Sequence, residues 1–202
     1  VLSMSSITLL MPFYLQNVRH FSIIRVGLTM TAIPLTMFVF APIAGRLSDS
    51  YSTRLLTALG IGVLTFSLCL LSFLSISSTQ EPWVIVLNIC FVGMGFGLFQ
   101  SPNSKVILSD VSHENLGMAS ALLATVRNLG IVTGTALSSM LLMVYYSKHG
   151  LLIPAPSHEI FVYALKETFL TIALFCALGI PAVFLTKTKK AHHETIHQRP
   201  VH

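Results

Sequence analysis

The chain has 202 residues, of which 53% are hydrophobic and only 9% are Asp, Glu, Lys or Arg. Soluble domains carry about 25% charged residues, so this composition excludes an ordinary soluble globule and predicts a membrane protein. The formal net charge is +5. We attribute it to basic flanks that face anionic lipid, and we expect no nucleic-acid partner.

Six apolar segments follow one another along the chain, and each predicts a membrane-spanning helix. A hydrocarbon core needs about 20 residues to cross. Five segments without Asp, Glu, Lys or Arg come close to or exceed that length: 26–45, 55–80, 82–104, 128–147 and 168–186. The sixth, 1–16, is uncharged but short, and it begins with Val1 rather than Met. We therefore expect an all-α membrane protein with six transmembrane helices over 1–187, the first helix truncated.

Basic residues predict how these helices are oriented. If the loops alternate between the two sides of the membrane, one side holds seven Lys and Arg residues and the other holds four. The positive-inside rule places the richer side in the cytoplasm. We therefore expect a multi-pass protein of the cell membrane, with loop 46–54 and the C-terminus cytoplasmic. The tail 188–202 is basic and polar, and we expect it to be disordered.

A cluster of charges separates the second and third predicted helices. Arg46, Asp49 and Arg54 lie within nine residues, directly after Gly45, which allows a close turn. Serines around Asp49 can cap the next helix, and either arginine can pair with Asp49. From the residues alone, a capped basic turn and a conformational gate explain this pattern equally well.

Two of the later predicted helices carry glycines four residues apart. Gly93 and Gly97 lie in the fourth helix, and Gly130 and Gly134 lie in the fifth. This spacing leaves a strip without side chains, where another helix can approach closely. We therefore predict tight helix packing at both pairs.

Arg127 is the one charge well inside an apolar helix, if the fifth helix runs from about 117 to 146. A charge at membrane depth is costly and normally faces a cavity or a partner. If 128–147 alone crosses the membrane, Arg127 instead lies at the inner interface and snorkels. We favour the cavity because Asn128 follows and no local acid neutralises Arg127.

Three further polar residues are candidates for a substrate pathway. Gln100 and Asn103 cluster at the inner end of the fourth helix, and Gln16 lies at the outer end of the first. Each can line a pathway, or cap and pack against neighbouring helices. No predicted span contains Asp or Glu, and we expect Glu167 only at the outer edge of the sixth helix. We predict no metal site and no cofactor.

The segment "GRLSDSYSTR" resembles the signature loop of the major facilitator superfamily, written G-x-L-a-D-r-x-G-r-[KR]. Gly45, Leu47, Asp49 and Arg54 match it, whereas Ser50 and Ser52 replace the usual arginine and second glycine. This copy looks like the weaker one of that family, which lies in the C-terminal half of the transporter.

Two other segments resemble the drug:proton antiporters with fourteen spans in that superfamily. They are "FYLQNVRHFSIIRVGLTMTAIPLTM" and "GMASALLATVRNLGIVTGTAL". The likeness implies two inverted three-helix repeats, 1–75 and 83–187, and proton-coupled efflux of small amphipathic compounds. It also implies a missing N-terminal half that carries the proton-coupling carboxylates. A cargo-free assembly subunit is the alternative, and a multi-span membrane enzyme is a more remote one.

Overall fold

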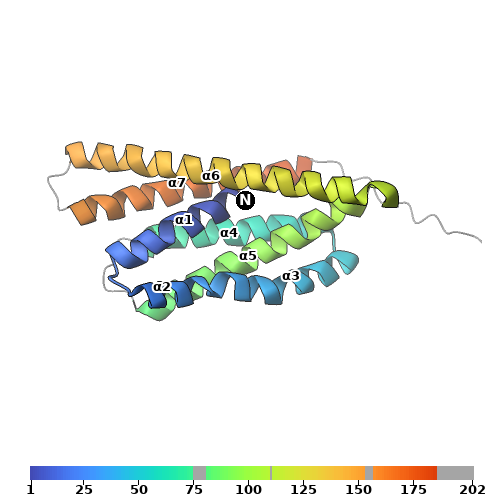
Figure 1. Cartoon of the computed structure of the whole chain (residues 1–202), viewed down its shortest axis with the longest axis horizontal. Coiled ribbons are helices and arrows are strands. Elements are labelled where there is room, and N and C mark those ends of the chain that lie inside the picture. The colour runs from blue at the N-terminus through green and yellow to red at the C-terminus, as the bar shows by residue number, and fades with distance from the viewer. Residues whose placement is uncertain (75–80, 110, 153–156, 186–202) are drawn as a thin grey trace, which may run out of the picture.

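The computed structural model describes residues 1–74, 81–109, 111–152 and 157–185, so the predicted tail 188–202 lies outside the described residues. Within these ranges the regular elements are helices (Figure 1). They are α1 (Leu2–Asn17), α2 (Ile23–Met30), α3 (Ala32–Ser50), α4 (Thr53–Leu74), α5 (Pro82–Ser109), the short 3-10 helix η1 (His113–Asn115), α6 (Leu116–Leu152) and α7 (Ser157–Leu185). The prediction of an all-α protein is confirmed.

Five of the described helical segments are long and apolar enough to cross a membrane. They correspond in order to the last five predicted spans: Ile23–Ser48, Thr53–Phe73, Pro82–Ser109, His113–Gly150 and Glu159–Phe184. The remaining helix, α1, has 16 residues, so it is short of a full crossing, as the sequence indicated. Among the described residues the bundle therefore has six long helices when α2 and α3 are taken as one span, and five of them are long enough to cross a membrane.

The helix is interrupted at Thr31, between α2 and α3, and Pro34 explains the interruption. Proline has no backbone N–H, and its ring collides with the carbonyl four residues earlier, which here belongs to Met30. The Thr31 hydroxyl donates to the Gly27 carbonyl at 2.8 Å. That bond keeps the end of α2 closed where the backbone ladder is interrupted. Helical bonds continue on both sides of Pro34's missing donor, since the Thr31 amide donates to the Gly27 carbonyl at 3.0 Å and the Leu35 amide to the Thr31 carbonyl at 3.2 Å.

The helices lie roughly along one axis and fall into two groups (Figure 1). In one group, α5 packs against both α3 and α4, and in the other α1 packs against α6 and α7. The groups are joined through an extensive contact between α4 and α7. Fully buried side chains such as Leu68, Ile89 and Phe169 fill the core. In contrast, α6 leaves most of its long surface exposed.

Close contacts between helices occur at glycines. A Cβ atom on Gly93 would overlap the Thr36 hydroxyl and lie 2.6 Å from the Ile33 carbonyl oxygen, and one on Gly97 would lie 3.3 Å from the Ala41 nitrogen. Both glycines therefore face α3. Glycine is needed here because a larger residue would force the two helices apart.

The second glycine pair brings α6 against α1. A Cβ atom on Gly134 would overlap the Ser5 hydroxyl and lie 3.0 Å from Leu2 Cα, and one on Gly130 would lie 3.2 Å from a Val1 methyl. A buried hydrogen bond of 2.5 Å between the Ser6 and Ser138 hydroxyls joins the same two helices. Polar contacts of this kind hold helices together in lipid, where apolar burial gives no advantage.

A third close approach, between Gly60 of α4 and Gly95 of α5, was not predicted. A Cβ atom on Gly60 would lie 2.8 Å from the Gly95 carbonyl oxygen. Gly60 and Gly95 lie in different helices, so a pattern of glycines four residues apart within one helix does not include this pair. Only the packed structure brings them together.

We predict that Gly93→Ala destabilises the bundle by about 1–3 kcal/mol, because the new methyl group overpacks the contact with α3. The matched control is Gly62→Ala in α4, since a Cβ atom there has no neighbour within 4 Å. That control should be neutral or stabilising by up to about 1 kcal/mol. Thermal unfolding of both purified variants in detergent measures the difference, and equal melting temperatures would contradict the packing argument.

Candidate functional site

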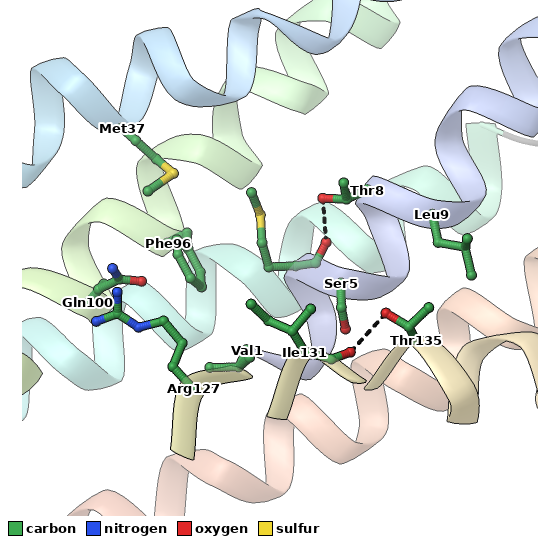
Figure 2. A pocket seen from close by; sticks show the side chains of 11 residues that line it. Val1, Ser5, Thr8, Leu9, Met37, Phe96, Gln100, Arg127, Ile131 and Thr135 are labelled. Atoms are coloured by element: carbon green, nitrogen blue, oxygen red, sulfur yellow. Dashed lines mark hydrogen bonds between the residues drawn. The ribbon is translucent and has the colours of Figure 1, made fainter. Parts of the chain in front are cut away.

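A cavity of about 530 Å³ lies between α1, α3, α5 and α6 (Figure 2). Pockets that bind drug-sized molecules measure about 300–1,000 Å³, so the volume suits a small organic ligand. Its wall is mostly apolar, with a few polar side chains. The lining residues are Val1, Met4, Ser5, Thr8, Leu9, Met37, Phe96, Gln100, Arg127, Ile131 and Thr135.

Arg127 reaches this cavity from α6. The helix begins at Leu116 and runs to Leu152, so Arg127 lies eleven residues, about three turns, inside it. The long helix expected around Arg127 is therefore present. Its guanidinium points toward Gln100 of α5 (Figure 2). Within the part of the chain that the structure describes, Arg127 has neither an ion pair nor a hydrogen-bond partner.

The hydroxyl groups of the cavity are already engaged as donors. Ser5 donates to the Leu2 carbonyl at 2.9 Å, Thr8 to Met4 at 2.9 Å and Thr135 to Ile131 at 2.8 Å. Each hydroxyl thus satisfies a carbonyl of its own helix and offers the cavity only acceptor capacity. The free donors among the lining side chains are the Arg127 guanidinium and the Gln100 amide.

Helical spacing places the two polar residues on the lining surface. Gln100 lies four residues after Phe96, and Ile131 lies four residues after Arg127, so each pair shares a helix face and lines the cavity. Gln100 also follows Gly97 by three residues, and Arg127 precedes Gly130 by three. The glycines that hold each helix against its partner therefore lie one turn from the polar side chains.

The other predicted pathway residues are not part of this cavity. Asn103 lines a separate cavity of about 300 Å³, together with Arg54 and residues of α7. Asn128 is exposed on α6, and Gln16 is exposed near the end of α1. The structure thus brings Arg127 and Gln100 together and leaves Asn103, Asn128 and Gln16 elsewhere.

The predicted gate loop differs from expectation in its local structure. Gly45 does not form the turn, because α3 continues to Ser50 and the chain reverses at Tyr51 and Ser52. A Cβ atom on Gly45 would lie 3.2 Å from the Ser101 hydroxyl oxygen, so this glycine serves close packing against α5. The Ser52 carbonyl, rather than a serine side chain, accepts the Leu55 amide at 2.9 Å. Arg46 and Asp49 lie in the last turns of α3, and Arg54 lies in the first turn of α4.

One titratable pair was missed by the sequence analysis. Glu167 lies ten residues inside α7 rather than at its outer edge, because the helix begins earlier, at Ser157. Glu167 therefore lies within the helical segment Glu159–Phe184, which is long and apolar enough to cross a membrane. His149 Nε2 of α6 lies 3.3 Å from Glu167 Oε1, and the His149 ring contacts Tyr163. The two residues are on different helices, so no sequence spacing connects them.

The bundle of membrane helices around an amphipathic cavity is the architecture of a membrane transporter. Residues 1–201 match the sequence pattern of the Major Facilitator Superfamily. The chain therefore belongs to this superfamily, whose members are transporters and not enzymes. The predicted superfamily and the prediction that the chain is not an enzyme are confirmed.

Three relatives illustrate the range of similar proteins. The riboflavin transporter RibZ of Clostridioides difficile is 31% identical, over 92% of this chain and 40% of its own length. The uncharacterized transporter YebQ of Escherichia coli is 39% identical, over 65% of this chain and 28% of its own. The multidrug resistance protein Stp of Mycobacterium tuberculosis is 26% identical, over 69% and 25%. The chain thus spans less than half the length of these relatives.

We predict that a cysteine at Thr135 reacts with a soluble maleimide, because it lines the cavity that also holds the positive charge of Arg127, which favours the reactive thiolate. Thr133→Cys, on the same helix but outside the cavity lining, is the matched control and should react much more slowly. Both are made after Cys69, Cys90 and Cys176 are replaced by alanine. Mass spectrometry of the labelled protein measures the two rates, and equal rates would argue against an accessible cavity.

Proposed function

We propose that the chain is the C-terminal half of a secondary transporter that moves small amphipathic compounds across the cell membrane in exchange for protons. The observation that carries this proposal is the cavity of about 530 Å³. In it the Arg127 and Gln100 side chains point toward one another, and the rest of the wall is mostly apolar. The cavity has an apolar wall with a few polar side chains, and it lies between two groups of helices. Such a site suits a cargo that must bind and then leave.

The packing pattern supports two three-helix repeats, 1–75 and 83–187. In this division α1 and α5 are the first helices of the two repeats. Each packs against the second and third helices of the other repeat: α1 against α6 and α7, and α5 against α3 and α4. The third helices, α4 and α7, pack on each other. These exchanged contacts come in corresponding pairs, which is the pattern that a pseudo-twofold axis relating the two repeats would produce.

Relatives and cavity chemistry support an aromatic or amphipathic cargo. The names of similar proteins include a riboflavin transporter and a multidrug resistance protein. Phe96, Met4 and Met37 supply an apolar wall for a ring system, and methionine adapts to rings of different shape. The drug:proton antiporter branch with fourteen spans is the assignment within the superfamily that we propose.

The turn between α3 and α4 is proposed as the conformational gate. Asp49 lies in the last turn of α3, where a negative charge is unfavourable next to the carbonyl end of the helix. A state in which Asp49 pairs with Arg46 or Arg54 relieves this cost, and a second state releases the pair. A few kcal/mol of difference between the states is enough to shift their populations. We place this turn and the C-terminus in the cytoplasm.

We predict that Asp49→Asn lowers transport while the protein still inserts into the membrane, because the gate loses its charge pair. Glu81→Gln, which removes an exposed carboxylate from the opposite end of the bundle, is the control and should transport normally. The variants are made in the complete coding frame, and drug efflux is compared at equal membrane abundance. Unchanged efflux by Asp49→Asn would remove the gate from the proposal.

We predict that a cysteine at Ser50, in the cysteine-free background, is labelled only after a reagent enters the cell. Ser50 is exposed at the end of α3, so access depends on the side of the membrane. Glu81→Cys marks the other side and should react with an impermeant maleimide on intact cells. Labelling of Ser50→Cys from outside would reverse the proposed orientation.

A further inference from the structure

The cavity lining contains a positively charged hydrogen-bond donor but no negatively charged acceptor, and this bears on the charge of its ligand. The lining hydroxyls already donate to helix carbonyls, so the side-chain donors left for a ligand belong to Arg127 and Gln100. None of the eleven residues that line the cavity is Asp or Glu. The cavity therefore offers a positive charge and an amide, with no carboxylate to balance a cationic ligand.

An unpaired guanidinium in a largely apolar cavity favours an anionic or acceptor-rich ligand. Arg presents parallel N–H groups that match two oxygens of a carboxylate, or a pair of ring carbonyls. The Gln100 amide, which points toward Arg127 (Figure 2), can donate to a carbonyl and accept from an imide N–H. An organic cation would meet the like charge of Arg127 and would have to lose its water without compensation.

We propose that this cavity binds planar aromatic compounds through an anionic or carbonyl-rich edge and disfavours organic cations, an inference that rests on the proposed transport function. Arg127 and Gln100 hold the polar edge. The ring system lies against Phe96, Met4 and Met37, since thioethers and rings contact each other favourably. Arg127 thus sets the charge preference, whereas the apolar wall sets the size and shape.

Two dyes that share a xanthene ring system and differ in charge test this proposal. At mildly alkaline pH, fluorescein is an anion and rhodamine 6G is a cation. Their binding to the complete purified protein in detergent is measured by fluorescence polarisation. We expect tighter binding of fluorescein, and a fluorescein affinity that falls about tenfold or more in Arg127→Gln, as charge-assisted bonds are lost. Rhodamine 6G binding should stay the same or become tighter.

Three further variants separate this charge effect from misfolding. Lys148→Gln removes an exposed positive charge from the same helix and should leave both affinities unchanged. Arg127→Lys keeps the charge but loses the two parallel N–H groups of the guanidinium, so it should retain the preference for fluorescein with a weaker affinity. Gln100→Glu faces Arg127 with a carboxylate and should remove the preference. Melting temperatures close to that of the unmodified protein show that each variant is folded.

Several outcomes would overturn the inference. In the first, the unmodified protein binds rhodamine 6G more tightly than fluorescein. In the second, neither dye binds a folded preparation. In the third, Arg127→Gln changes the affinity for both dyes equally. The last result would mean that Arg127 does not set the charge preference of the cavity. Transport in proteoliposomes keeps the two proposals apart. Gradient-driven flux of rhodamine 6G alone would leave the proposed function standing and overturn the charge preference, whereas no flux of any tested compound would overturn the function.

Discussion

The close approach of helix backbones at glycines is the constraint on which the rest of this structure depends. In a bilayer, burying apolar side chains gives helices little reason to associate, so contact area and interhelical hydrogen bonds decide which helices meet. Gly93 and Gly97 hold α5 against α3, and Gly130 and Gly134 hold α6 against α1. The bundle is thereby built as two tightly joined pairs that also share the α4–α7 contact.

The cavity follows from this arrangement, because it lies where glycines do not draw helices together. Residues of α1, α3, α5 and α6 line it, so the two glycine-packed pairs form its opposite walls. Contact between α5 and α6 themselves is sparse. The polar side chains lie three residues from the glycines, one turn along each helix. Packing and binding are thus arranged on neighbouring faces of the same helices.

Two kinds of polar group inside the bundle differ in what they bind. Ser6 and Ser138 bond to each other, and Ser67 of α4 bonds to Asn88 of α5 at 2.5 Å, so these groups fasten helices. Arg127 and Gln100 have no such partners among the described residues and face the cavity. An unsatisfied polar group in a membrane protein is expensive. This free energy cost is offset when a ligand, water or another part of the transporter binds the group.

The sequence by itself determined the class of the protein, because the scarcity of charge and the length of the apolar segments leave few alternatives to a helical membrane bundle. Its pattern also predicted close helix packing at the two glycine pairs and the long helix around Arg127. Periodicity acts along one helix, so it predicted which residues share a face.

Only the tertiary structure decided which faces meet. It placed Arg127 and Gln100 on one cavity and Asn103 on another, paired His149 with Glu167, and brought Gly60 against Gly95. It also moved the turn from Gly45 to Tyr51 and Ser52. A glycine permits both a turn and a close helix contact, and the choice depends on the neighbouring helix. Contacts between helices far apart in sequence leave no periodic signal within either helix, so no reading of a single segment contains them.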